Sequence, residues 1–188
     1  MERSMEPHKL RLFFALVPDA AVQASLGGIA RDVALHAGGR AIVDANIHLT
    51  LAFIGDVHRD RADSLREILR ALPSEQFVLA LDCIGTFRNS QIAWIAPSTI
   101  PAALLELQSS LAAALAANDF PVEERPFHAH VTLARRCARN IARTRHIPVE
   151  WRVERVALMA STAAGNGGVC YREVAGISLV ENAGYRAP

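Results

Sequence analysis

The chain has 188 residues, a formal net charge of +1 and 51% hydrophobic residues. This length is enough for one domain with a real core, and the near-neutral charge excludes a global basic field of the kind that attracts nucleic acid. The apolar residues are dispersed in short runs, so we expect no membrane span of ~20 residues. Cys83, Cys137 and Cys170 have no zinc or redox spacing, which favours reduced thiols in a cytoplasmic protein.

The first half of the chain predicts alternating strands and helices. The apolar run 10–17 is typical of a strand. Asp19 is a suitable N-cap for a helix over 20–36. A second strand is expected over 48–54, and the amphipathic pattern of 60–72 predicts a further helix.

The second half of the chain is richer in strand signals. The expected strands are 77–86, 91–96, 151–160 and 171–180, the expected helix is 101–117, and a Gly-rich loop at 161–169 separates the last two strands. The Arg-rich segment 135–148 is compatible with a loop or an irregular helix. Because hairpin-like strand pairs accompany the alternation, an α+β domain with mainly antiparallel sheets is favoured over a doubly wound parallel sheet.

One short pattern, apolar-His-apolar-Thr-Leu, occurs twice, at 47–51 and at 129–133. None of the other histidines, of which the chain has seven in all, is followed by Thr at the second position. On a strand, side chains at i and i+2 point to the same face, while their neighbours point to the other. Each segment therefore offers an imidazole and a hydroxyl to one surface and anchors its other face in a core.

The segments that precede the two motifs are also alike. Pro18 and Pro97 each end an apolar run, a helical stretch follows, and His48 and His130 come 30 and 33 residues after these prolines. We interpret this strand–helix–motif repeat as an internal duplication within a single bilobal domain over 1–188.

Two histidines that face each other across a cleft suit paired general acid and general base catalysis, because imidazole titrates near neutral pH. Displacement at phosphorus requires the attacking and leaving oxygens to lie roughly in line on opposite sides of the phosphorus. Thr50 and Thr132 can donate hydrogen bonds to the non-bridging oxygens as their charge rises. His48 and His130 are thus the candidate catalytic residues, and we expect neither a metal nor a cofactor.

Three other interpretations remain open. His128 and His130 form a His-x-His pair that can chelate a metal from a strand, although no third ligand with suitable spacing follows. Either motif histidine can also be an ordinary core residue bonded to backbone. Five arginines follow the second motif, either as a solvated basic face or as phosphate ligands. They are Arg135, Arg136, Arg139, Arg143 and Arg145.

The paired His-x-Thr-Leu motifs resemble those of the two-histidine (2H) phosphoesterase superfamily, and within it the bacterial RNA 2′,3′-cyclic phosphodiesterases, also called 2′-5′ RNA ligases. The resemblance runs over nearly the whole chain. It covers the opening strand at 11–15, the first motif at 46–55, the middle hairpin at 84–94 and the second motif at 127–135. One departure is Ala129, where the family usually has Pro before the histidine.

The resemblance implies a bilobal α+β fold with two pseudo-symmetric, mainly antiparallel sheets flanked by helices around a central cleft. It implies His48 as proton donor and His130 as proton acceptor, and it implies phosphate contacts from Thr50, Thr132 and Arg135.

The sequence therefore predicts a cytoplasmic, monomeric, metal-independent hydrolase that opens 2′,3′-cyclic phosphate ends of RNA or nucleotides to 2′-phosphomonoesters. Alternatives are the joining of RNA ends through a 2′-5′ linkage, hydrolysis of another cyclic phosphate such as an ADP-ribose derivative, and an RNA-binding module without turnover.

Overall fold

The computed structural model describes residues 9–73, 75–163 and 168–181. The α-helices are α1 (Ala20–Ala37), α2 (Ala62–Arg70) and α3 (Ala102–Ala117), and three single 3₁₀ turns are η1 (Asp44–Asn46), η2 (Arg59–Arg61) and η3 (Arg88–Ser90). The strands are β1 (Lys9–Leu16), β2 (Arg40–Ala41), β3 (Leu49–His58), β4 (Phe77–Phe87), β5 (Ile92–Ala96), β6 (Val131–Arg135), β7 (Thr144–Val153), β8 (Arg155–Ala163) and β9 (Val169–Ser178). Part of the expected Gly-rich loop, 164–167, lies outside the described residues.

The strands form one sheet in the order β7-β4-β5-β6-β3-β1-β8-β9, with the short β2 on β6. All pairings between these strands are antiparallel, which confirms the α+β, antiparallel prediction. The expected two sheets are the two four-stranded halves of this order. In the described part of the chain a single residue pair, Leu49 with Val131, joins β3 of one half to β6 of the other.

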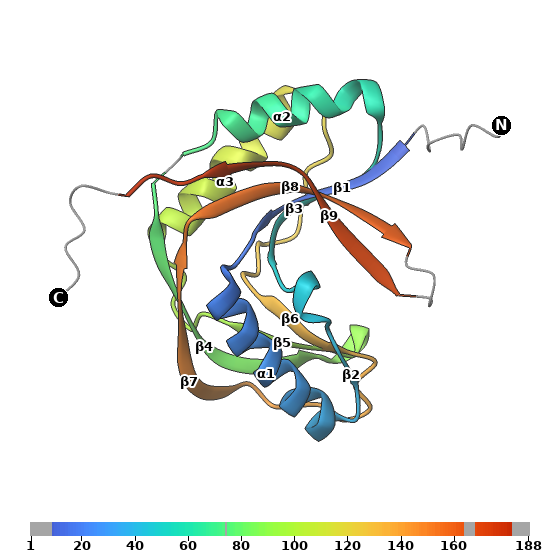
Figure 1. The fold of residues 1–188 in the computed structure, drawn as a ribbon, viewed down its shortest axis with the longest axis vertical. Helices are drawn as coiled ribbons and strands as arrows, with labels where there is room; N and C mark the ends of the chain where they lie inside the picture. The colour runs from blue at the N-terminus through green and yellow to red at the C-terminus, as the bar shows by residue number, and fades with distance from the viewer. Residues whose placement is uncertain (1–8, 74, 164–167, 182–188) are drawn as a thin grey trace.

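Helices α1 and α3 each pack on the half of the sheet opposite to that of the strand they follow. Helix α1 follows β1 in the chain but packs against β6 of the other half, and α3 follows β5 but contacts β3. Figure 1 shows α1 over β5 and β6, with α2 and α3 together at the opposite end of the molecule. The apolar stripe of α3, formed by Leu104, Leu107, Leu111 and Leu115, is almost fully buried. Each half is therefore covered by a helix that follows a strand of the other half in the chain.

The structure corrects the interpretation of 135–148. The sequence favours a loop or irregular helix there, but β7 begins within the segment, at Thr144, and pairs with β4. The strand lies at the edge of the sheet, where Pro148 is tolerated because a missing N–H toward solvent breaks no ladder hydrogen bond. Its arginines and proline conceal the alternation that marks a strand.

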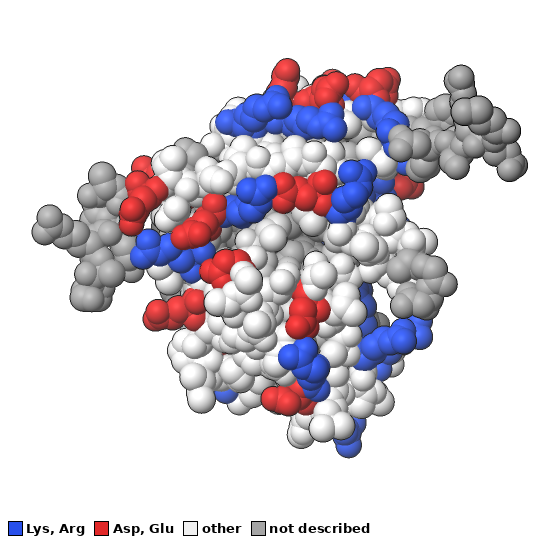
Figure 2. Space-filling view, in the orientation of Figure 1, with Lys and Arg blue, Asp and Glu red and all other residues white. Residues whose placement is uncertain are grey.

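Charged side chains of both signs share the surface. Figure 2 shows rows of mixed blue and red over α2 and β9, rather than a continuous basic field, in keeping with the net charge of +1. In the described ranges no helix has the length and apolar character needed to cross a membrane. The cysteines Cys83, Cys137 and Cys170 form no disulfide.

The predicted N-cap of α1 is confirmed, and it generates a stability prediction. Asp19 accepts a hydrogen bond from the Val22 N–H at 2.8 Å, so Asp19→Ala should lower the free energy of unfolding by about 1 kcal/mol. Asp32 is exposed in the middle of α1, and Asp32→Ala is the matched control, expected to be neutral or slightly stabilising. Urea denaturation measures both, and equal effects would contradict the capping role.

Candidate active site

The two motifs meet at the pair that joins the two halves of the sheet. Leu49 and Val131 are fully buried neighbours on antiparallel strands. Because such neighbours are related by a local two-fold axis, and each lies between the His and the Thr of its motif, His48 corresponds to His130 and Thr50 to Thr132. These four residues are partly buried, and alternation places their side chains on the face opposite Leu49 and Val131.

Both imidazoles are held in the same way by backbone. His48 Nδ1 lies 2.7 Å from the Asn46 carbonyl oxygen, and His130 Nδ1 lies 2.7 Å from the His128 carbonyl oxygen. A carbonyl oxygen can only accept, so Nδ1 carries the proton in each neutral ring and Nε2 carries the lone pair. His48 Nε2 contacts the Thr50 hydroxyl at 3.0 Å. In both motifs the nitrogen that can accept a proton is therefore Nε2.

The electrostatics favour the neutral form of both rings in the free protein. Burial lowers the pKa of His48, and the positive charges of Arg135 and His130 lower it further. Burial likewise lowers the pKa of His130, to which the charges of His128 and Arg135 add. Since Arg135 acts on both imidazoles, the structure brings this arginine and the two histidines into one site.

A β-bulge directs Arg135 to this site. In β6, Ala134 pairs with Ala93 while Thr132 pairs with Trp94, so Leu133 is an extra residue on its strand. Simple alternation would put position 135 on the core face with Leu133, but a bulge reverses the facing of the strand residues beyond it. Arg135 is accordingly exposed.

The other half repeats this bulge. In β3, Ala52 pairs with Phe14 and Thr50 with Ala15, which leaves Leu51 as the extra residue. The residue equivalent to Arg135 is therefore Phe53, whose side chain is 49% exposed. The same β-bulge thus occurs in both halves, but the residue two positions after it is Phe53 in one half and Arg135 in the other.

Aromatic rings flank both histidines. Phe13 and Tyr171 each lie with the ring centroid 5.0 Å from that of His48, and Phe87 lies 5.0 Å from His130, edge to face. The sequence reasoning missed these contacts as part of the site. Phe13 and Phe87 fall in segments that carried the family resemblance, whereas no local signal marks Tyr171, more than a hundred residues from His48 in the chain.

A pocket of about 440 Å³ opens on the His130 side of the junction. It is lined by Phe87, Trp94, Ala96, Pro97, Ser98, Ile100, His128, Ala129, His130 and Arg143. His48 is not among these residues, so the two equivalent histidines have different surroundings.

The arginines that follow the second motif contact different parts of the fold. Arg139 donates to the Leu35 carbonyl oxygen at 3.3 Å, Arg143 Nε donates to Cys83 Sγ at 3.2 Å, and Arg145 pairs with the Asp82 carboxylate. Hydrogen bonds from the Ser98 hydroxyl and the Ser98 backbone N–H, and then the Arg145 charge, lower the pKa of Asp82. Of the run, Arg135 is the member whose charge reaches the histidines.

The chelation alternative gains no support from the described residues. No group of three or more His, Cys, Asp and Glu side chains placed to hold a metal occurs in them. His128 is exposed, and it serves His130 through its carbonyl oxygen. Metal independence itself stays a prediction.

The imidazole geometry can be tested by ¹⁵N NMR. We expect the neutral rings of His48 and His130 to be Nδ1–H tautomers with pKa values below the ordinary ~6.5, and inorganic phosphate should raise both pKa values because an anion favours imidazolium. The His48→Ala and His130→Ala variants assign the signals. An Nε2–H tautomer in either ring would contradict the carbonyl hydrogen bonds.

Known proteins are similar to this chain in sequence and in fold. The chain matches the model of the 2′-5′ RNA ligase superfamily over residues 18–165. It is 33% identical over 97 residues to the RNA 2′,3′-cyclic phosphodiesterase of Escherichia coli (strain K12), covering 52% of this chain and 55% of that protein. It is 32% identical over 117 residues to the protein of the same name from Aeropyrum pernix, covering 59% of this chain and 66% of that one.

These alignments span less than two thirds of either relative's length, whereas the structural match extends further. The crystal structure of E. coli LigT in its apo form superposes with a TM-score of 0.82 at 27% identity, over 92% of this chain and 99% of that one. The family model accounts for most of the chain, including both His-x-Thr motifs. The chain belongs to the 2′-5′ RNA ligase superfamily.

Proposed function

We propose that this protein is a cytoplasmic, monomeric RNA 2′,3′-cyclic phosphodiesterase that hydrolyses 2′,3′-cyclic phosphate ends of RNA or nucleotides to 2′-phosphomonoesters without a metal or cofactor. The observation that carries the proposal is the two-fold relation of the motifs about Leu49 and Val131. It supplies two imidazoles whose Nδ1 atoms are both bound to backbone carbonyl oxygens, with Nε2 as the nitrogen that can accept a proton. In the free protein His48 Nε2 contacts the Thr50 hydroxyl. The names of the two relatives support the same substrate class.

The roles of the histidines follow the family resemblance. His130 Nε2 takes a proton from water as the water oxygen attacks phosphorus. The P–O3′ bond breaks on the opposite side, and His48 Nε2 gives its proton to O3′. The phosphate stays on O2′, and the two histidines exchange protonation states. The Nδ1 hydrogen bonds to backbone keep both rings in position throughout.

The remaining residues bind the phosphate. Thr50 and Thr132 lie on the same face as the imidazoles and donate to the non-bridging oxygens, whose charge increases in the transition state. Arg135, the charge that reaches both histidines, neutralises the phosphate. The internal duplication explains why the site has two equivalent walls, and we propose it as the origin of the fold.

The alternatives within the same chemistry change either the attacking group or the substrate. Joining of RNA ends through a 2′-5′ linkage replaces water by a 5′-hydroxyl, and hydrolysis of another cyclic phosphate, such as an ADP-ribose derivative, keeps water and changes the substrate. We disfavour an RNA-binding module without turnover, because both motif histidines are present and both hold Nδ1 on a backbone carbonyl oxygen, which keeps the proton-accepting nitrogen at Nε2.

The direct test is phosphorus NMR of a 2′,3′-cyclic nucleotide incubated with the protein. We expect a 2′-phosphate as the main product, at a rate that EDTA leaves unchanged. His48→Ala and His130→Ala should each lower turnover by about 10²–10⁴-fold, and the double variant should lose less than the product of both effects, since the pair acts as a unit. A 3′-phosphate product would reverse the leaving oxygen, and activity lost in EDTA but restored by Zn²⁺ would return His128 to the site.

The lowered pKa values predict the pH dependence. Catalysis needs one neutral and one protonated imidazole, and above both pKa values the pair is doubly neutral. The bell-shaped profile of kcat/KM, which reports the free enzyme, should therefore be centred below pH ~6.5. The profile of kcat should lie at higher pH, because bound phosphate favours imidazolium.

A matched pair of variants checks the electrostatic cause of this shift. Arg135→Gln removes a positive charge that lowers both pKa values, so its kcat/KM profile should move to higher pH while binding weakens. Arg136→Gln changes the charge of an exposed neighbour and should leave the profile in place. A kcat/KM optimum well above neutrality in the unmodified protein would contradict the free-enzyme pKa directions.

A further inference from the structure

The short strand β2 places a second arginine beside Arg135. It pairs with the end of β6, with Arg40 opposite Arg135 and Ala41 opposite Ala134. The side chains of directly opposite residues on antiparallel strands lie on the same face of the sheet. Ala134 is buried and Ala41 packs on the core, so Arg40 and Arg135 share the other face, which is the face of the site.

The end of α1 determines where β2 lies. The helix is closed by Gly38 in the left-handed conformation, with a φ of 63°, and the Gly39 N–H donates to the Ala34 carbonyl oxygen at 2.8 Å. A Cβ added at Gly39 would lie 3.0 Å from the Arg135 carbonyl oxygen, so the absence of a side chain there permits the close approach of the two strands. Arg40 follows directly, and its backbone is held by both α1 and β6.

No acidic side chain in the described ranges neutralises this pair. Arg40 and Arg135 are both exposed, and neither takes part in the salt bridges of those ranges. Figure 2 shows basic side chains without acidic neighbours at the right-hand edge, at the level of β2 in Figure 1. Because like charges directly opposite each other destabilise a strand pair, this arrangement favours the binding of an anion.

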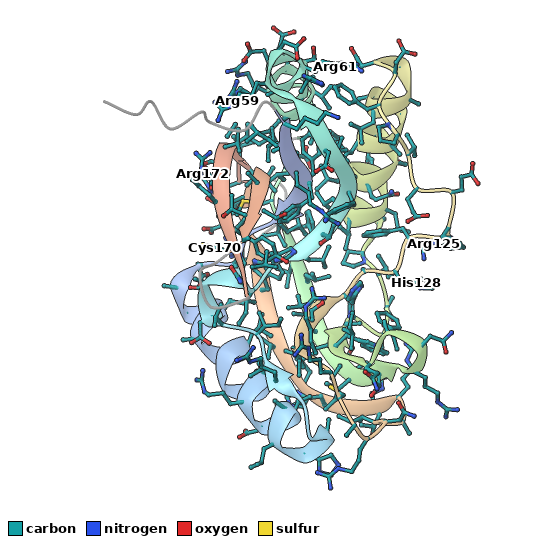
Figure 3. The ribbon with its side chains drawn as sticks, turned by 90° about the vertical axis from the view of Figure 1, so that its right-hand side faces the viewer. Arg59, Arg61, Arg125, His128, Cys170 and Arg172 are labelled. Atoms are coloured by element: carbon teal, nitrogen blue, oxygen red, sulfur yellow. The ribbon has the colours of Figure 1, made fainter. Side chains whose placement is uncertain are left out.

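The corresponding segment of the other half has its arginine neutralised. Figure 3 shows Arg125 and His128 on the loop that leads from α3 into β6. Glu123 accepts hydrogen bonds from Arg125 Nε at 2.9 Å and from Arg125 Nη2 at 2.6 Å. The segment that leads from α1 to the first motif carries Arg40, for which the described residues provide no such partner. The free positive charge therefore belongs to one wall of the site.

Strand β9 covers the flank of His48. The Asn46 side chain bonds to the β9 backbone through Nδ2 at 2.6 Å and Oδ1 at 3.2 Å, and the Tyr171 ring packs edge-on against His48. The residue equivalent to Asn46 on the other flank is His128, whose exposed side chain hydrogen bonds to none of the described residues. Figure 3 shows Cys170 of β9 on the opposite side of the molecule from His128. A long substrate therefore has more room beside β6 than under β9.

We propose that Arg40 binds the phosphodiester that precedes the terminal nucleotide, so that the site prefers an RNA end to a free nucleotide. This inference rests on the proposed function, in which Arg135 holds the cyclic phosphate. Successive phosphates of an RNA strand present charges one nucleotide apart, and guanidinium is the side-chain group best shaped to bind phosphate. Two unneutralised arginines on neighbouring strands match two successive phosphates.

Two dinucleotides that end in a 2′,3′-cyclic phosphate test the contact. Their nucleosides are joined by a phosphodiester in one and by an uncharged methylphosphonate in the other, and a 2′-O-methyl group on the first ribose protects both linkages. The unmodified protein should hydrolyse the phosphodiester compound with a kcat/KM about tenfold higher, because only a charged linkage binds Arg40 strongly. Arg40→Gln should abolish most of this preference, and Arg40→Lys should retain part of it.

The preference is a ratio measured on one protein, so partial loss of folded enzyme does not change it. Arg70→Gln is the matched control, because it removes the same charge from an exposed position on α2 and should keep the preference. Arg135→Gln should lower kcat/KM for both dinucleotides, which share the cyclic phosphate. For the phosphodiester compound, the plot of log kcat/KM against log salt concentration should be shallower by about 0.7 in Arg40→Gln.

The outcomes separate this contact from the proposed function. Equal losses of kcat/KM on both dinucleotides in Arg40→Gln would overturn the contact, because Arg40 would then act on the cyclic phosphate or on the fold. Equal hydrolysis of both dinucleotides by the unmodified protein would also overturn it and would leave the hydrolase intact. The absence of turnover with every cyclic phosphate would reject the hydrolase and this role of Arg40 together.

Discussion

The pairing of Leu49 with Val131 is the constraint on which the site depends. It is the one ladder contact between the two halves in the described part of the sheet, and both side chains are fully buried. Side chains alternate along a strand, so anchoring these two residues in the core turns both imidazoles and both threonine hydroxyls to the other face. The exchange of α1 and α3 reinforces the joint, because each helix packs on the half opposite to that of the strand it follows in the chain.

The orientation of each imidazole is then determined by the backbone of its own motif. Each ring donates Nδ1–H to the carbonyl oxygen two residues earlier, so the tautomer is determined by backbone that the strand already holds in place. Burial lowers both pKa values, and a protonated ring becomes favourable only when an anion enters. In the proposed reaction, the negative charge of the bound phosphate therefore favours the protonated imidazole that serves as the acid.

Most elements and both motifs were predictable because their signals are local: apolar periodicity, the Asp19 cap, and a His-x-Thr spacing that a strand converts into a shared face. Three features were not predictable, since they depend on partners distant in sequence. In the edge strand β7, the arginines and Pro148 obscure the alternation of apolar and polar residues that predicts a strand. The face of the sheet on which Arg135 lies depends on a β-bulge in β6, and this bulge can be recognised only from the pairing of β6 with β5. The cover over His48 depends on hydrogen bonds between Asn46 and β9.

Symmetry supplies two equivalent histidines, and divergence between the halves determines how they are used. The bulges at Leu51 and Leu133 present Phe53 in one half and Arg135 in the other. The Phe53 ring lies under the Arg11 guanidinium, whose Cζ is 5.0 Å from the ring centroid, so the two walls differ in the side chain at this position. Asn46 and His128 differ in the same way, and one flank is covered while the other opens. A symmetric pair alone would accept a phosphate in either direction. Both asymmetries distinguish the same two walls. Under the proposed function they give the reaction a direction, in which Arg135 holds the phosphate and the open flank at His130 admits the attacking water.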